Sequence, residues 1–148
     1  MRPCSSFLRL AAASVLLAGC GYESAGTWDD DPGNWERAFH SGRPPDVVVV
    51  HSKYWRSAHW TLEFQYFFHL GKNDALRKQL FAENKLARME GEAAARASSD
   101  FFGDKPAWFL PGRVSDYEVW AIAAETGRHF RVFIDRRTGE LFVADWTV

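Results

Sequence analysis

Residues 47–56 (VVVVHSKYWR) and 60–70 (WTLEFQYFFHL) decide the fold of this 148-residue chain. Four consecutive valines favour extended backbone, because branching at Cβ restricts the side chain. In the second stretch, large apolar residues alternate with Thr61, Glu63 and Gln65, which is typical of a strand with one buried face. Only three residues separate the two stretches, so the sequence predicts an antiparallel hairpin.

Helical patterns lie on both sides of this hairpin. Asp31-Pro32 predicts the start of a short helix, because Asp can cap free backbone amides and Pro tolerates the first helical turn. Residues 41–45 (SGRPP) end that helix. Apolar residues recur at helical spacing over 74–84, and strong helix formers fill 92–97. The sequence therefore predicts one helix before the hairpin and a helical region in two pieces after it.

The last third of the chain begins with an irregular segment and continues as strands. Residues 100–114 hold aromatic residues, glycines and prolines, and we expect them to form a loop packed on the domain. Alternating patterns then predict three strands, joined by connections that contain Thr-Gly pairs, because Gly readily adopts positive φ. These strands are expected at residues 117–124, 129–135 and 140–146.

Together these elements predict a single α+β domain over residues 31–148. The expected architecture is an antiparallel sheet of about five strands, with helices on one face. The first two strands form the hairpin and the last three form a meander. Residues 20–30, which contain Gly, Ser, Ala and Thr, are expected to be a tether.

Aromatic residues make up 16% of the chain and include seven Trp. Rigid rings favour interfaces as well as cores, because they bury a large area at a small entropic cost. A core of this size cannot easily house every Trp, so some are expected to stay partly exposed. We expect these among Trp28, Trp55, Trp60 and Trp108.

The length of the connection sets the expected register of the hairpin. A three-residue loop places Arg56 opposite Trp60 and Lys53 opposite Glu63, and opposite charges across strands support this register. The remaining expected pairs are Tyr54 with Leu62, Ser52 with Phe64, Val50 with Tyr66, Trp55 with Thr61, and His51 with Gln65.

The tip of this hairpin carries the candidate binding site. In the expected register Trp55 lies beside Lys53, Arg56 and His59, on a sheet face without a helix. A ring flanked by cations suits an acidic or aromatic partner, through stacking and charge-assisted hydrogen bonds. The alternative is that residues 100–114 fold over this face and bury Trp55.

Motifs of catalysis and metal binding are absent from the sequence. No Gly-x-Ser-x-Gly elbow occurs, as a serine hydrolase of that class requires. His51, His59 and His69 lack the close pairing of zinc motifs, so neither a metal site nor a cofactor is expected. This favours a non-enzymatic protein. An envelope hydrolase that uses His and carboxylate side chains is the alternative.

The charge balance argues against a nucleic-acid partner. The chain has 18 Lys and Arg against 19 Asp and Glu, a formal net charge of −1. Proteins that bind nucleic acids need clustered basic residues. Here the basic doublet Arg136-Arg137 is explained by a turn.

The first twenty residues have the parts of a secretory signal. Arg2 and Arg9 supply the positive end, and Leu10–Ala18 is an apolar run too short to span a bilayer as a helix. Leu17-Ala18-Gly19-Cys20 then resembles the lipobox of bacterial lipoproteins, in which a small residue precedes an obligatory Cys.

This resemblance implies that residues 1–19 are a cleaved signal peptide. It also implies diacylglycerol on the sulfur of Cys20 and, usually, acylation of the new amino group, so that the chain is held to a lipid bilayer. Two or three acyl chains make an effectively permanent anchor. In Gram-negative lipoproteins an Asp after the Cys commonly signals retention in the inner membrane. Gly21 at that position favours the periplasmic face of the outer membrane.

The sequence therefore predicts a membrane-anchored envelope lipoprotein that binds an envelope protein or polymer. A hydrolase is one alternative. Another is an immunity or inhibitor lipoprotein that guards against a secreted toxin. Both a binding module and an immunity protein need an exposed rigid face and no catalytic set, so the sequence barely separates them.

Overall fold

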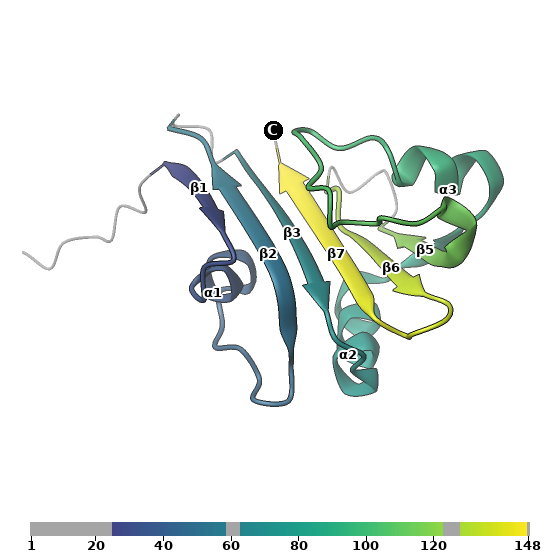
Figure 1. Ribbon diagram of the computed structural model, residues 1–148, viewed down its shortest axis with the longest axis horizontal. Coiled ribbons are helices and arrows are strands. Elements are labelled where there is room, and N and C mark those ends of the chain that lie inside the picture. Colours follow the sequence, from purple (N-terminus) through teal and green to yellow (C-terminus); the bar gives the residue numbers. More distant parts are fainter. Residues whose placement is uncertain (1–24, 59–62, 123–127, 148) are drawn as a thin grey trace, which may run out of the picture.

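The computed structural model describes residues 25–58, 63–122 and 128–147, which form a seven-stranded antiparallel sheet with helices against it (Figure 1). The strands are β1 (Gly26–Asp29), β2 (Val49–Arg56), β3 (Phe64–Leu70), β4 (Ala87–Met89), β5 (Tyr117–Ala121), β6 (Arg131–Asp135) and β7 (Leu141–Thr147). The helices are α1 (Asn34–Phe39), α2 (Asp74–Asn84) and α3 (Gly91–Ala97), with a 3-10 turn at Val114–Asp116.

The order of strands across the sheet is β1-β2-β3-β7-β6-β5-β4. The predicted α+β class, the hairpin β2–β3 and the meander β5–β6–β7 are confirmed. The C-terminal strand β7 lies between β3 and β6, so it joins the hairpin to the meander in the middle of the sheet.

Two short edge strands raise the count from about five to seven. β1 falls within the predicted tether, so the expectation of a tether was wrong for residues 26–29. This strand is held by Trp28, which packs beside Tyr54 of β2 and under the guanidinium of Arg37. β4 pairs with β5 and is only three residues long. Neither segment is long enough to show a period of two in the sequence.

The register of the hairpin differs from the expected one by four residues. Tyr54 pairs with Tyr66 and Lys53 with Phe67, whereas the sequence predicted Leu62 and Glu63 as their partners. Because Arg56 pairs with Phe64 and not with Trp60, the midpoint of the hairpin lies two residues further along the chain than expected. The shift is even, so each side chain still points to the face that the alternation predicts.

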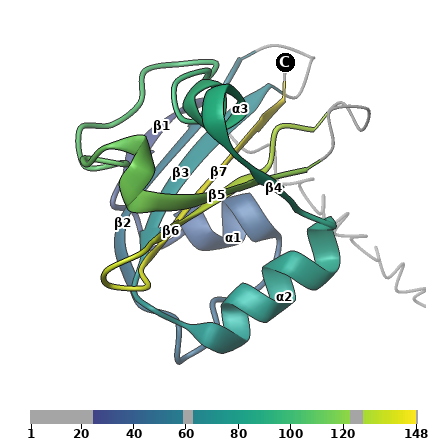
Figure 2. The same cartoon turned by 90° about the vertical axis from the view of Figure 1, so that its right-hand side faces the viewer.

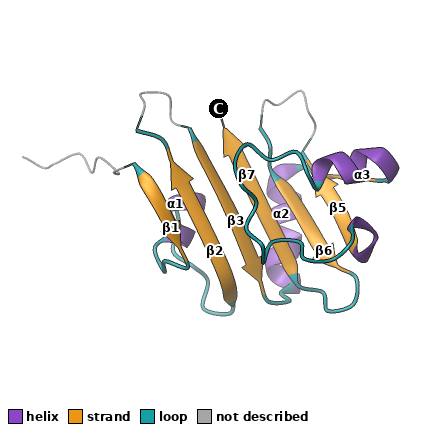
Figure 3. Cartoon of the chain, turned by 45° about the horizontal axis from the view of Figure 1, so that its top comes forward, coloured by secondary structure: helices purple, strands orange, loops and turns teal. Residues whose placement is uncertain are grey.

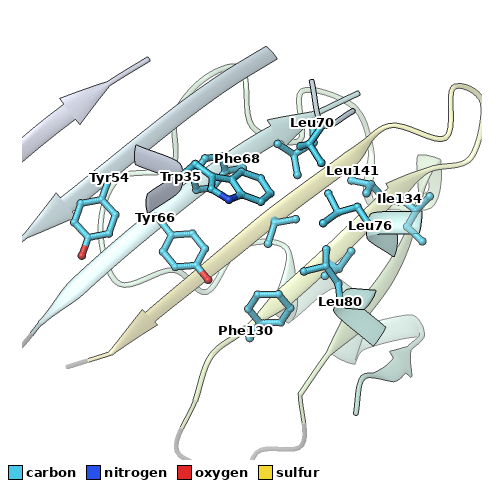
Figure 4. Packing of buried hydrophobic residues seen from close by; sticks show 13 residues of the cluster. Trp35, Tyr54, Tyr66, Phe68, Leu70, Leu76, Leu80, Phe130, Ile134 and Leu141 are labelled. Atoms are coloured by element: carbon cyan, nitrogen blue, oxygen red, sulfur yellow. The ribbon is translucent and has the colours of Figure 1, made fainter. Parts of the chain in front are cut away.

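On one face the sheet is covered by α1 and α2 (Figures 2 and 4). Figure 4 shows Trp35 of α1 against Phe68, and Leu76 and Leu80 of α2 among Leu141, Ile134 and Phe130. α2 begins where the sequence predicts, and the side chain of its N-cap Asn73 accepts a hydrogen bond from the Leu76 amide at 2.8 Å. α1 begins at Asn34, three residues after the expected Asp31 cap.

Asp31 nevertheless organises the approach to α1. Its carboxylate accepts hydrogen bonds from the Gly33 amide and from Arg37, each at 2.8 Å. The Asp31 carbonyl in turn accepts from the Asn34 amide at 3.0 Å. The local turn therefore uses the residue that the sequence indicated, but as an Asx turn ahead of the helix and not as its cap.

The opposite face is covered by α3 and by a covering loop, residues 98–113, so the prediction of helices on one face was wrong (Figure 2). Figure 3 shows this loop running across β7 and β6. Phe109 of the covering loop is fully buried and lies near Phe67, Phe133 and Phe142 of the sheet. The predicted packing of the aromatic segment on the domain is thereby confirmed.

Several predicted features lie outside the described residues. These are the signal peptide 1–19, Cys20, residues 21–24 of the tether, His59 with the strand start at 60–62, and the Thr126-Gly127 connection. Within the described part of the chain, no helix is both long and apolar enough to cross a membrane.

Candidate functional site

Two of the predicted binding residues line a cavity on the face that the covering loop crosses. Lys53 and Trp55 are two residues apart on β2, so both side chains point to the face away from α1. Arg56 points to the other face, as Tyr54 does. The cavity has a volume of about 270 Å³. It is lined by Thr27, Lys53, Trp55, Gln65, Phe67, Phe102, Gly103 and Asp104. The structure therefore brings Lys53 and Trp55 together and separates them from Arg56.

Two aromatic rings form a wall of this cavity. The ring centroids of Trp55 and Phe102 lie 5.6 Å apart, with the planes tilted by 46°. Trp55 is half-buried, and Phe102 is 49% exposed. The alternative in which the loop folds over this face is thus correct in part, because the loop covers one side of the Trp55 ring and leaves the cavity beside it.

Gln65 holds the covering loop to the sheet. Its side chain is 5% exposed, and its Oε1 accepts a hydrogen bond from the Gly103 amide at 2.8 Å. Because a backbone N–H can only donate, the amide oxygen of Gln65 must face the loop. A Cβ on residue 103 would lie 2.7 Å from that oxygen, so a larger residue at this position would displace the Gln65 amide.

The other end of the same amide has no acceptor. Gln65 Nε2 is buried and makes no hydrogen bond within residues 25–58, 63–122 and 128–147. A buried donor that lacks an acceptor loses its hydration without compensation. Gln65 lines the cavity, so a small movement of its amide toward the cavity would let a bound molecule supply the acceptor.

The cavity is also lined by one positively charged residue, Lys53, and one negatively charged residue, Asp104. The ammonium of Lys53 and the carboxylate of Asp104 form no ion pair with any residue that the structure describes. The lining therefore offers donors from Gln65 and Lys53, an acceptor from Asp104, and the flat faces of Trp55 and Phe102. Such a lining suits a small polar molecule with an apolar face.

Buried contacts at the base of the covering loop fix the position of this wall. The guanidinium of Arg131 donates to the carbonyl oxygens of Ala97 and Asp100 at 2.6 and 2.7 Å. It lies over the ring of Trp146, 4.4 Å from the centroid. Burial lowers the pKa of Arg131 from its ordinary value, and the nearby Asp100 opposes this shift. The two bonds tie the end of α3 and the start of the loop to β6.

Two imidazole–carboxylate pairs lie on the same face, toward the other end of β2 and β3. His51 Nδ1 is 3.2 Å from the carboxylate of Asp30, and His69 Nε2 is 3.3 Å from that of Glu140. The ring centroids of the two His residues are 6.2 Å apart. The pKa of Asp30 is lowered, chiefly because its carboxylate accepts the Ser52 amide and also because it contacts His51.

The surroundings of these pairs are aromatic. Trp108 stacks on His51 with ring centroids 5.3 Å apart, and Phe142 stacks on His69 at 4.3 Å. Within the described segments neither imidazole hydrogen-bonds to a Ser or Thr hydroxyl, as an activated nucleophile requires. No three His, Cys, Asp or Glu side chains of these segments come together in a group that could hold a metal ion.

Sequence reasoning missed most of the cavity, because its lining comes from β1, β2, β3 and the covering loop. The alternation places Gln65 on the polar face of its strand, whereas the structure buries its side chain and bonds it to the Gly103 amide. The chain matches no protein-family model, and neither a curated protein nor a solved structure matches it.

Proposed function

We propose that this chain is a membrane-anchored bacterial envelope lipoprotein that acts as a non-enzymatic binding module, and that the cavity at Trp55 is its binding site. One observation carries the binding proposal: the buried Gln65 Nε2 has no acceptor among the described residues, and Gln65 lines a cavity walled by Trp55 and Phe102. Sites for small molecules are typically concave and largely apolar, with a few polar groups that fix orientation.

The proposed anchor rests on the sequence Leu17-Ala18-Gly19-Cys20. Acylation of Cys20 would hold the module at a membrane surface, on the periplasmic face of the outer membrane in a Gram-negative cell. There the module would meet an envelope protein or polymer at high local concentration.

Metabolic labelling with an alkyne-bearing fatty acid tests the anchor. We expect the wild-type chain to be labelled and Cys20→Ala to be unlabelled. Cys4→Ala is the matched control, because its sulfur lies within the proposed signal peptide, and it should label like the wild type. Labelling that survives Cys20→Ala, or an intact mass without acyl chains, would refute the proposed anchor.

Paired Trp substitutions test the binding site. We expect Trp55→Ala to abolish retention of the full chain on envelope fractions stripped of lipid, to which the acyl anchor cannot contribute, without loss of cooperative melting. Trp108→Ala is the control, since this Trp is also half-buried but stacks on His51 away from the cavity. Equal retention of both variants would show that the cavity is not the binding site.

A further inference from the structure

We infer that the cavity at Trp55 binds one pyranose ring of a glycan, an inference that rests on the proposed function as a binding module. The cavity combines an aromatic wall with a buried amide that lacks an acceptor. A pyranose has a flat face of C–H groups and a rim of hydroxyls, so it offers both kinds of contact at once.

The aromatic wall selects a ligand with a flat apolar face. Trp55 and Phe102 present their rings at an angle of 46°, and Phe102 is 49% exposed beside the cavity. Large exposed aromatic side chains favour recognition, because they supply contact area with few rotatable bonds. The C–H face of a sugar ring can lie against Trp55 while its edge remains hydrated.

The polar groups select against two other ligand classes. A carboxylate ligand would accept from Gln65 and Lys53, but it would also meet the negative charge of Asp104. A purely aromatic or aliphatic side chain would leave Gln65 Nε2 without an acceptor. Hydroxyl and acetamido groups both donate and accept, so they can satisfy the amide, the ammonium and the carboxylate together.

The size of the cavity limits the ligand to about one ring. Its volume of about 270 Å³ lies just below the range typical of sites that enclose a drug-sized ligand. A single sugar unit would therefore occupy the cavity, and neighbouring units of a polymer would extend over the surface. Affinity for a single ring is expected to be weak, and anchoring would compensate by raising the local concentration.

Chemical-shift mapping tests the inference on the full chain, labelled with ¹⁵N in a detergent without a sugar headgroup. The probes are N-acetylglucosamine, glucose and their tetrasaccharides. We expect the side-chain amide of Gln65 and the indole N–H of Trp55 to shift together, with tighter binding of the tetrasaccharides. Trp55→Ala should weaken binding by about tenfold or more, and Trp108→Ala by less than about twofold.

Two further variants test the contribution of the Gln65 amide separately from that of the aromatic wall. Gln65→Leu removes the donor, and Gly103→Ala keeps it but forces the amide away, since the added Cβ would lie 2.7 Å from Oε1. Either variant should weaken sugar binding by about threefold to tenfold while Trp55 stays in place. If Gln65→Leu fails to fold, Gly103→Ala alone gives the readout.

A second panel of acidic and aromatic peptides distinguishes the inference from the proposed function. Trp55-dependent shifts with peptides but not with sugars would overturn the glycan inference and leave the binding module intact. Sugar shifts that persist in Trp55→Ala would place the sugar elsewhere and overturn the inference. The absence of any Trp55-dependent ligand in both panels would overturn the inference and the proposed site together.

Discussion

The two faces of the sheet are covered in different ways, and the difference explains where the cavity lies. α1 and α2 cover one face (Figure 2). A helix satisfies its own backbone hydrogen bonds, so the side chains that it packs on the sheet can be apolar. An irregular loop covers much of the other face, and its backbone groups need partners from side chains. The Gln65 side chain accepts from the Gly103 amide, and the Lys105 ammonium donates to the Phe109 carbonyl. The Arg131 guanidinium donates to the carbonyls of Ala97 and Asp100.

The comparison teaches that buried polar side chains serve different partners under the two covers. Beneath the helices Asn34 donates to the Ser52 hydroxyl, whereas on the other face Gln65 and Arg131 bond the backbone of the covering loop and the end of α3. On the helix-covered face the neighbours of Phe68 are the rings of Trp35, Phe39 and Tyr66. On the loop-covered face a glutamine and an arginine are nearly buried beside aromatic rings. Polar groups held in an apolar setting are what a specific binding site requires.

The largest expected effect is the loss of cooperative folding when apolar packing is removed from both faces of the sheet at once. Truncation after Gly139 removes β7, which supplies Leu141 and Val143 to one face and Phe142 and Ala144 to the other. It also exposes the edges of β3 and β6 in the middle of the sheet. We expect the truncated chain to show no cooperative transition in urea. A soluble, cooperatively unfolding truncation would refute the central role of β7.

Matched substitutions compare the two covers directly. Phe68 and Phe109 are both fully buried, one beneath α1 and one within the covering loop. We expect Phe68→Ala and Phe109→Ala each to lower the free energy of unfolding by about 3–5 kcal/mol, because each leaves a cavity in an aromatic cluster. Urea denaturation measures both. A loss below about 1 kcal/mol for Phe109→Ala would show that the loop is not part of the core.

The anchoring of the loop is expected to matter somewhat less. Arg131→Met removes two charge-assisted hydrogen bonds and leaves the carbonyls of Ala97 and Asp100 without them. We expect a loss of about 2–4 kcal/mol and faster proteolysis within the covering loop. Arg96→Met, on the exposed side of α3, is the control and should change stability by less than about 0.5 kcal/mol. Equal protease resistance in both variants would contradict this role of Arg131.

The smallest expected effect depends on pH and concerns a polar residue on the helix-covered face. Burial raises the pKa of Asp145 despite its contact with Arg128. The folded protein therefore retains this proton more tightly than the unfolded chain, and the resulting stability is lost as pH rises through the folded-state pKa. We expect Asp145→Asn to remove this loss, so that its advantage over the wild type grows from pH 3 to pH 7.

Asp135 provides a control of opposite sign. Hydrogen bonds from the amides of Thr138 and Arg137 outweigh burial and lower the pKa of Asp135, so its stabilisation is lost as pH falls through the folded-state pKa. Asp135→Asn should therefore be most harmful near neutral pH. Urea titrations at several pH values measure both variants, and parallel pH profiles for the two would contradict these assignments.

The sequence predicted the elements whose patterns are long. The strand at 64–70 and the helix at 74–84 each contain several repeats of their period, and a cap residue marks the start of the helix. The period of two also predicted the face of each side chain in the hairpin. The register was not predictable, because β3 also pairs along its whole length with β7, whose residues lie 71 to 83 positions further along the chain.

The candidate site could be predicted only in part for the same reason. Trp55 and Lys53 stand out within one strand, so local alternation places them on one face. Gln65 meets Gly103 across 38 residues of chain, and no local pattern indicates that contact. The cavity is a product of tertiary packing, and the sequence indicated its aromatic wall but not its amide.

The edge strands also determine how this sheet meets other copies of itself. An exposed edge is a template for pairing with another chain, and the risk of aggregation rises with its length. Here the edges are β1 and β4, which have four and three residues, whereas the other strands of the sheet have five to eight. Beyond β1 the backbone turns at Asp30, whose φ of 49° lies in the left-handed region. A neighbouring copy therefore finds only a few residues of each edge strand to pair with.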